Sequence, residues 1–351
     1  MSEKQKDEIT IVAGPCAVES EEQTMDMGEK ISTILHIAAS YNIRGMFRGG
    51  AYKPRTNFVV QNGSRSEKVF EGTGEDGVKW LAQVAGQFGI PVVSEVMSEM
   101  DIRHFARYLE ADRDFLQIGA RTSQAFALLY EVGGYGFSVV LKNPQHGVDP
   151  AEAVGSLERF QKNKELAYCI RGQKRPIDPS GENSAEHLAY LTSLHASPHQ
   201  YRDARNLNNI ASIGKLRSMP SLDNVSLWYD PSHIFGGKTD EMRRTIGDYA
   251  KKAITEFGYD GIIVEVNDRS ATAKCDADQA MFSTLRGIDW SQTKVGLDPE
   301  QKPLSLVDVV KEIMFYQVQR GATTMLHGAL EADYKTLDSL RWDLPLERLV
   351  H

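Results

Sequence analysis

The stretch DGVKWLAQVAGQFGIPVVSEV, residues 76–96, decides the fold class. Its first part spaces apolar residues as an amphipathic helix does, and Gly89 marks the position where such a helix stops. Its second part, residues 91–96, is a short apolar run typical of a buried strand. A helix that leads directly into a buried strand indicates a β/α unit, in which successive strands are parallel.

The same alternation runs along most of the chain. Strands are predicted at residues 9–14, 43–49, 91–96, 114–119, 137–143, 165–172, 225–231 and 261–267. A clear helical pattern follows each of these strands but one, and among these helices are residues 122–134 and 149–163. Eight such units predict an α/β fold of the closed (β/α)8 type, a TIM barrel. An open, doubly wound sheet is the alternative that the pattern leaves open.

Two segments exceed a minimal barrel. Residues 173–224 join the sixth and seventh strands and are long for such a connection, so we expect a lid or a subunit contact there. Residues 303–351 carry a further helical pattern, which either packs on the outside of the barrel or contacts another subunit. We therefore predict a catalytic barrel at 1–302, including the insert, and a C-terminal helical extension at 303–351.

Composition excludes several classes of protein. The chain has 351 residues and a formal net charge of −8, which disfavours nonspecific binding to nucleic acid or to anionic membranes. No apolar run approaches the roughly 18 to 20 residues of a membrane span. Three cysteines make no disulfide framework, and the polar first residues lack the apolar core of a signal peptide. We expect a soluble, cytoplasmic protein.

Cations gather where the predicted strands end, which is where barrel enzymes place their chemistry. The second strand leads into MFRGGAYKPRTN, residues 46–57, a stiff loop with three cations. Across all the strand ends the cations are Arg48, Lys53, Arg55, Arg121, Lys142 and Arg171. Like charges placed together require compensating anions. Two phosphates and a carboxylate would engage all of them, so we predict a site for small anions.

A second cluster follows the first, seventh and eighth strands, which are neighbours in a closed barrel. Its members are Cys16, His233, Glu265 and Asp276. Thiolate, imidazole and carboxylate ligands suit a divalent metal ion such as Mn, Fe, Co or Zn. Cys275, beside Asp276, is a rival ligand, whereas Cys169 lies inside the sixth strand and is expected in the core.

The residues of both clusters lie in motifs that resemble those of a known family. The matching motifs are GPC at 14–16, FRGGAYKPRT at 47–56, IGART at 118–122, LKN at 141–143, IRG at 170–172, DPSH at 230–233 and EV at 265–266, followed by Asp276. In them the chain resembles the type I 3-deoxy-D-arabino-heptulosonate 7-phosphate (DAHP) synthases, in family order over most of its length. KPRT is the most specific of the motifs.

The resemblance implies a metal-dependent condensation of phosphoenolpyruvate with erythrose 4-phosphate, which releases phosphate and opens the shikimate pathway. It places around phosphoenolpyruvate Arg48, Lys53, Ala120, Arg121, Lys142 and Arg171. It places against the sugar phosphate Lys53, Pro54, Arg55 and Thr56. It makes the metal ligands Cys16, His233, Glu265 and Asp276. Candidates for catalytic proton transfer are Lys53, His233 and Glu95.

Other functions remain as alternatives. A 3-deoxy-D-manno-octulosonate 8-phosphate synthase would use a five-carbon aldose phosphate, although KPRT argues against it. A metal-dependent aldolase would work without phosphoenolpyruvate, and a non-catalytic barrel subunit would have no need for the two clusters. The resemblance also implies a homodimer or homotetramer, with small-molecule substrates and neither nucleic-acid nor membrane partners.

Overall fold

The structure is a computed structural model of the chain. It describes residues 7–55, 59–62, 65–145, 150–160, 162–172, 208–233, 240–268, 273–275, 280–283, 305–321, 323 and 327–341. Of the predicted site residues, Thr56 and Asp276 lie outside these ranges.

In the described part of the chain, eight parallel strands close into a barrel in the spatial order β1, β10, β9, β8, β7, β6, β5 and β2. They are β1 (Ile9–Gly14), β2 (Ile43–Arg48), β5 (Val92–Val96), β6 (Phe115–Ile118), β7 (Ser138–Lys142), β8 (Leu166–Arg171), β9 (Ser226–Asp230) and β10 (Gly261–Glu265). Strand β1 pairs in parallel with both β2 and β10, so that Val12 lies beside Met46 and beside Ile263. The predicted closed barrel is confirmed, and the open sheet is excluded.

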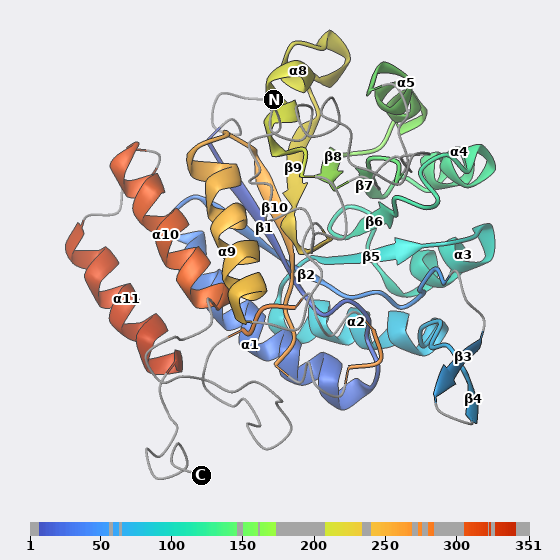
Figure 1. Cartoon of the computed structure of the whole chain (residues 1–351), viewed down its shortest axis with the longest axis horizontal. Coiled ribbons are helices and arrows are strands. Elements are labelled where there is room, and N and C mark those ends of the chain that lie inside the picture. Colours follow the sequence, from blue (N-terminus) through green and yellow to red (C-terminus); the bar gives the residue numbers. More distant parts are fainter. Residues whose placement is uncertain are drawn as a thin grey trace, which may run out of the picture.

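Helices surround the barrel on its outside (Figure 1). In chain order they are α1 (Glu21–Ala39), α2 (Glu75–Phe88), α3 (Glu99–Tyr108), α4 (Phe126–Gly134), α5 (Pro150–Gly155), α8 (Ile213–Arg217), α9 (Asp240–Thr255), α10 (Leu306–Gln319) and α11 (His327–Arg341). The Ser20 side chain accepts a hydrogen bond from the backbone N–H of Gln23 and so caps α1. Ser98 and Asp101 form a reciprocal capping box at the start of α3. Such caps satisfy backbone donors that would otherwise lack a partner, and they set where each helix begins.

Alternation of side chains along the strands separates two apolar layers. Outward-facing residues such as Ile11 and Leu116 pack with the helices in the main core. Inward-facing residues fill the barrel itself, and they are Val12, Met46, Val93, Phe115, Val140, Ala167, Cys169, Trp228 and Ile263. Cys169 is fully buried among them, which confirms its predicted place in the core. The interior of the barrel is therefore packed with side chains.

A charged pair covers this interior layer at the N-terminal end of the strands. The Arg44 guanidinium lies 5.3 Å from the centroid of the Phe115 ring and pairs with Glu165, the residue before β8. The cation sits over the aromatic face, and its charge is matched by a carboxylate. The opposite end of the barrel carries the polar residues of the site.

Three predicted segments differ in detail from the structure. Residues 122–125 form turns, in which the Thr122 and Ser123 hydroxyls donate to the Gly119 and Ala120 carbonyls, and α4 starts only at Phe126. The helix predicted at 149–163 ends at Gly155 and continues as a 3-10 helix, Ser156–Phe160. The polar loop expected after β2 contains an antiparallel hairpin, β3 (Val59–Asn62) and β4 (Arg65–Lys68), which stands away from the barrel in Figure 1.

The last part of the predicted insert packs on the barrel. Within residues 208–224, short helical turns bury Ile210, Leu216 and Leu222. The Tyr259 hydroxyl donates to the Ile210 carbonyl over 2.8 Å. Residues 173–207, where a lid or a subunit contact was expected, lie outside the described residues.

Helix α10 completes the ring of helices between α9 and α1 (Figure 1). Its buried face includes Val307, Val310 and Ile313, all in the main core. Helix α11 packs on α10, and the Tyr41 hydroxyl at the end of α1 donates to Asp333 over 2.6 Å. This packing places α10 with the barrel and leaves α11 outside it, whereas the domain boundary at residue 303 stays a prediction. In the described part of the chain, the helices are too short or too polar for any to cross a membrane.

Gly14 brings the ends of β1 and β2 into close contact. Its φ of +152° lies in a region that side chains disfavour, and a Cβ there would come 2.1 Å from the Arg48 carbonyl oxygen. Only glycine permits this approach, which sets Cys16 beside the loop that follows β2.

We expect Gly14→Ala to lower the free energy of unfolding by about 2 kcal/mol or more, because the backbone of Arg48 must move. Urea unfolding followed by circular dichroism measures it. Gly86→Ala is the matched control, since a Cβ at this helical position meets nothing within 4 Å, and it should leave stability unchanged or slightly higher. Equal stability of the two variants would show that the close approach is not required.

Candidate active site

A ring of inward-facing residues, polar except for Gly14, lies directly above the apolar layer inside the barrel. Each member is two residues beyond an inward-facing apolar residue of the same strand, so it also faces inward. The ring consists of Gly14, Arg48, Glu95, Gln117, Lys142, Arg171, Asp230 and Glu265. All are buried. The strands thus present charged groups to one another in a setting with little water.

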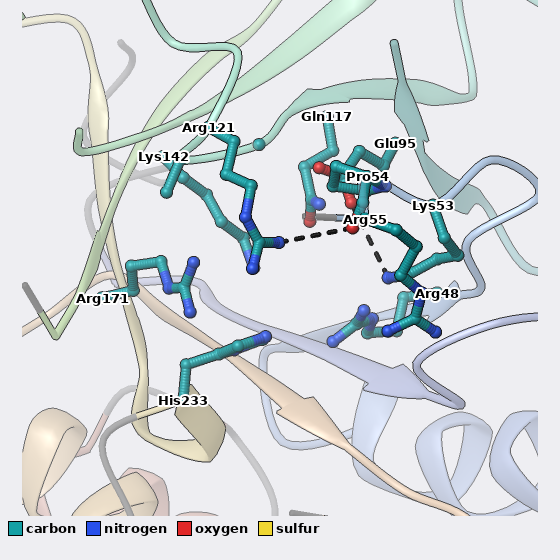
Figure 2. Close-up of a pocket in the computed structure, with 12 residues that line it drawn as sticks. Arg48, Lys53, Pro54, Arg55, Glu95, Gln117, Arg121, Lys142, Arg171 and His233 are labelled. Carbon is teal, nitrogen blue, oxygen red and sulfur yellow. Dashed lines mark hydrogen bonds and ion pairs between the residues drawn. The ribbon is translucent and has the colours of Figure 1, made fainter. Parts of the chain in front are cut away.

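A pocket opens above this polar ring. It is lined by Arg48, Lys53, Pro54, Arg55, Glu95, Gln117, Gly119, Ala120, Arg121, Lys142, Arg171 and His233. Figure 2 shows the labelled cationic side chains converging on one space from both sides of the barrel mouth. The structure therefore brings together the six cations predicted at the strand ends.

Backbone hydrogen bonds hold the cationic loop after β2. Gly50 donates to the Cys16 carbonyl over 3.2 Å, and Lys53 donates to the Glu71 carbonyl over 2.9 Å. The Arg55 Nε donates to the Phe70 carbonyl over 2.8 Å, and the Tyr52 hydroxyl contacts Nδ1 of His104 on α3. Because both ends are tied down, the loop presents its cations in a set direction.

Lys53 points from this loop into the pocket. Its Nζ donates to the Cys16 carbonyl over 3.1 Å and lies 3.7 Å from a Glu95 carboxylate oxygen. Burial acts to lower the pKa of Lys53, but nearby Cys16, Cys275 and Glu95 outweigh it and raise the pKa. Lys53 is therefore a firmly held cation.

Glu95 keeps its position because residue 119 is glycine. A Cβ on Gly119 would lie 1.8 Å from the Glu95 Oε1 atom. The carboxylate occupies the space that any other side chain at 119 would take. This is the physical reason for glycine in the IGART motif, and it sets Glu95 beside Lys53.

The remaining cations come from three neighbouring strands. Arg121, exposed at the rim, directs Nη1 to the Pro54 carbonyl over 3.5 Å (Figure 2). Lys142 and Arg171 are buried at the ends of β7 and β8. The Asn143 side chain accepts a hydrogen bond from the Arg171 backbone N–H over 2.6 Å, which ties the two strand ends together.

Asp230 connects Lys142 to His233. The Lys142 Nζ donates to Asp230 Oδ2 over 2.6 Å, and His233 Nδ1 lies 2.9 Å from the same oxygen. Burial alone would raise the pKa of Asp230, but His233 and Lys142 outweigh it and hold that pKa well below its usual range. Asp230 is thus a carboxylate at neutral pH, and its contact leaves Nε2 of His233 facing the pocket side.

Arg48 and Glu265 form a buried ion pair across the same end of the barrel. The Arg48 Nη1 donates to Glu265 Oε1 over 3.1 Å, and His233 Nε2 lies 3.5 Å from that oxygen. Burial acts to lower the pKa of Arg48, but Glu265 and other acidic groups outweigh it and raise the pKa. The second oxygen, Oε2, is buried and has no hydrogen-bond partner among the described residues.

The predicted metal ligands are partly brought together. Glu265 and His233 are adjacent, and the Cys16 Sγ lies 2.8 Å from the Sγ of Cys275, the rival ligand. In the described ranges, no three His, Cys, Asp or Glu side chains gather closely enough to hold a metal ion, and Asp276 lies outside those ranges. The buried Glu265 Oε2 nevertheless fits a cation, because an ionised oxygen there needs a positive partner.

The Cys16 thiol supports the same interpretation. Its hydrogen bond with Cys275, together with burial, raises the pKa of Cys16 well above its ordinary value. A thiolate at this position therefore requires a strong compensating charge, which a bound divalent cation supplies. Burial and the nearby Arg171 lower the pKa of His233, so its imidazole is neutral and able to act as a ligand.

Positive charge exceeds negative charge around the pocket. The cations that line it are Arg48, Lys53, Arg55, Arg121, Lys142 and Arg171, and the carboxylates that line it or pair with these cations are Glu95, Asp230 and Glu265. Six positive charges against three negative ones leave an excess of three. Guanidinium and ammonium groups in such a pocket bind phosphate and carboxylate oxygens. The site is therefore built for small, multiply charged anions.

Sequence reasoning missed three residues of the site. Asp230 was part of the DPSH motif, yet only His233 was taken from it. Gln117, in FLQIG, lines the pocket, and Asn143 holds the end of β8. The signal that could have found Asp230 and Gln117 is a polar residue at an inward position of an otherwise apolar strand.

Comparison with known proteins places the chain in a family. Residues 3–295 match the model of the DAHP synthetase I family. The chain therefore belongs to the DAHP synthetase I family.

Relatives agree with this placement. Phospho-2-dehydro-3-deoxyheptonate aldolase of Thermotoga maritima is 29% identical over 273 residues, which cover 78% of this chain and 65% of the relative. The chain thus spans just under two thirds of that relative's length. A 2-dehydro-3-deoxyphosphooctonate aldolase of Geobacter metallireducens is 25% identical over 279 residues, covering 76% of this chain and 85% of the relative.

A crystal structure of the Thermotoga maritima aldolase, a DAHP synthase, matches with a TM-score of 0.58 and 28% identity, covering 79% of this chain and 65% of the other. A truncated form of the synthase from the same organism gives a TM-score of 0.60 at 24% identity, with 90% and 89% covered, which supports the fold alone.

We expect Arg121→Ala to weaken binding of inorganic phosphate about fivefold to tenfold, because it removes a charge-assisted contact at the rim. Isothermal titration calorimetry measures it. Arg103→Ala, which removes an exposed arginine of α3 outside the pocket, is the matched control and should bind phosphate as the unmodified chain does. Equal weakening in both variants would mean that general charge, not the pocket, holds the anion.

Proposed function

We propose that this chain is a DAHP synthase, which condenses phosphoenolpyruvate with erythrose 4-phosphate to give DAHP and phosphate. The observation that carries the proposal is the excess of three positive charges around one pocket. Phosphoenolpyruvate brings a phosphate and a carboxylate, and the aldose brings a second phosphate. Membership of the DAHP synthetase I family supports the same reaction.

The deeper cations suit phosphoenolpyruvate. Lys142 and Arg171 are buried, and Arg121 reaches the same space from the rim. With Arg48, Lys53 and the neighbouring Ala120, they would hold both anionic groups and so orient the enol carbon. Holding two reactants in the right geometry supplies a large part of the rate of such a condensation.

The loop after β2 suits the sugar phosphate. Lys53, Pro54 and Arg55 line the pocket, and Thr56 follows them outside the described residues. Pro54 restricts the loop before any substrate arrives, which lowers the entropy lost on binding. Lys53 faces both substrate positions and would bridge them.

Cys16, His233, Glu265 and Asp276 would hold a divalent ion, one of Mn, Fe, Co or Zn. When bound, such an ion acts as a Lewis acid toward the aldehyde oxygen. The buried Glu265 Oε2 and the neutral imidazole of His233 are donors of the right kind. Cys275 remains a candidate ligand in place of Asp276 because its sulfur touches that of Cys16.

Proton transfer falls to residues beside these ligands. As the enol carbon bonds to the aldehyde carbon, the Lys53 ammonium would hydrogen-bond the aldehyde oxygen and pass it a proton. Glu95, 3.7 Å from Lys53, would take a proton from the water that adds to the former enol carbon and return it to Lys53, which stays a cation. The carbon–oxygen bond to phosphate would then break as the new hydroxyl group passes its proton to the phosphate, which leaves the ketone and hydrogen phosphate, and the surrounding arginines would stabilise the departing phosphate.

The cellular compartment and the oligomeric state are proposed from the resemblance to the DAHP synthases. We infer a cytoplasmic enzyme that works as a homodimer or homotetramer, without nucleic-acid or membrane partners. The three cysteines are buried as thiols in the structure, which agrees with a reducing compartment.

The choice of aldose is the first prediction that tests the proposed function. With Mn²⁺ present, phosphoenolpyruvate should be consumed with erythrose 4-phosphate and not with arabinose 5-phosphate, which loss of its ultraviolet absorbance reports. Consumption with the five-carbon sugar alone would support the octulosonate reaction instead, for which the Geobacter metallireducens relative is named. No consumption with either sugar would contradict the proposed function.

The metal ligands give the second prediction. Cys16→Ala should lose most bound metal and most metal-dependent turnover while its circular dichroism spectrum is retained, because a thiolate ligand is gone. Metal content by mass spectrometry and turnover are measured together. Cys275→Ala is the comparison: retention of metal assigns the thiolate to Cys16, whereas metal loss in Cys275→Ala alone would transfer the role to Cys275.

A further inference from the structure

A continuous line of buried contacts crosses the mouth of the barrel. It runs from Lys142 to Asp230 over 2.6 Å, from Asp230 to His233 Nδ1 over 2.9 Å, from His233 Nε2 to Glu265 over 3.5 Å and from Glu265 to Arg48 over 3.1 Å. Cations that face the anion pocket stand at its two ends, and the candidate metal ligands stand between them. The anion pocket and the metal ligands are therefore in direct contact.

Asp230 touches both the pocket cation Lys142 and the candidate ligand His233, and it is not itself one of the candidate ligands. It is completely buried. Its Oδ2 atom is shared, because Lys142 and His233 both lie within 2.9 Å of it. If the hydrogen bond between Lys142 and Asp230 weakens, the Asp230 carboxylate interacts more strongly with His233.

We propose that Asp230 is a positioning residue that couples anion binding in the pocket to cation binding at His233 Nε2. The proposal rests on the proposed function, which supplies phosphoenolpyruvate as the anion. When the anion binds, Lys142 donates a hydrogen bond to it, and the hydrogen bond between Lys142 and Asp230 weakens. Asp230 then binds the Nδ1–H of His233 more strongly, and Nε2 becomes a better electron-pair donor.

The coupling works equally in the opposite direction. A cation at Nε2 makes the Nδ1–H more acidic, so its hydrogen bond to Asp230 strengthens and Lys142 is released toward the pocket. Each ligand must raise the affinity of the other by the same factor, since coupling free energy is reciprocal. Asp230 also keeps the proton on Nδ1, so that Nε2 carries the free electron pair.

Asp230→Asn in the full chain tests this inference. The probes are Mn²⁺ and phosphoenolpyruvate without any aldose, so no turnover occurs, and free Mn²⁺ is measured by electron paramagnetic resonance. In the unmodified chain, phosphoenolpyruvate should tighten Mn²⁺ binding about tenfold. In Asp230→Asn, Mn²⁺ should bind about 10- to 100-fold more weakly, and the effect of phosphoenolpyruvate should fall below about twofold.

Asp223→Asn is the matched control, since Asp223 is an exposed aspartate at the opposite end of β9. It should behave as the unmodified chain does. A direct attraction between the bound anion and the metal would survive in Asp230→Asn, so a tenfold effect retained in that variant overturns the proposal. A purely structural role would weaken both ligands and leave their coupling in place, which also overturns it.

Lys142→Met is a second variant whose predicted effect has the opposite sign. Without Lys142, Asp230 interacts with His233 alone, so Mn²⁺ should bind without phosphoenolpyruvate as tightly as the unmodified chain binds it with phosphoenolpyruvate. Weaker Mn²⁺ binding in Lys142→Met would overturn the proposal even if Asp230→Asn does not fold. If the unmodified chain turns over both substrates yet shows no coupling, the inference is wrong and the proposed function stands. If coupling appears without turnover on any aldose, the proposed function fails and the inference holds for anions in general.

Discussion

Burial of charge at one end of the barrel is the constraint on which the rest of the site depends. Ionised groups lose hydration when they are buried, and they persist only where opposite charges or bound ligands replace the water. Arg48 with Glu265 and Lys142 with Asp230 meet this requirement inside the protein. The pocket cations still outnumber the carboxylates and favour bound anions, so the requirement that sets the internal pairs also sets what the pocket can bind.

The apolar layer beneath the polar ring makes this arrangement possible. Val12, Phe115 and Trp228 help to fill the interior of the barrel, so the charged side chains above them cannot enter it. These side chains therefore contact one another or face the pocket. Every strand contributes an apolar inward residue, and every strand but β1, which ends at Gly14, contributes a polar inward residue two positions later. The two layers are therefore in register around the barrel. A rigid floor of this kind holds catalytic groups to the small tolerances that reaction geometry demands.

Much of the fold could be predicted from the sequence, because short apolar runs and helical spacing repeat through the chain. The ends of the predicted strands then indicated the six cations and the candidate metal ligands Cys16, His233 and Glu265. Contacts that arise only when strands meet could not be read in this way: Asp230 and Gln117 look like ordinary polar residues until the barrel closes. The late start of α4 likewise depends on local hydrogen bonds of the Thr122 and Ser123 hydroxyls. The hairpin β3–β4 lies in a mainly polar stretch in which Asn62 and Gly63 signal a turn.

The contact between Gly119 and Glu95 constrains how this site can diverge. A Cβ at position 119 and a carboxylate at position 95 cannot occupy the same space, so the two positions are tied together although they belong to different strands. Among homologous sequences, a side chain larger than hydrogen at the first position should appear where the acid at the second has been lost, shortened or turned away from Lys53. Such replacement would mark, within an alignment, the lineages in which a different group lies beside Lys53.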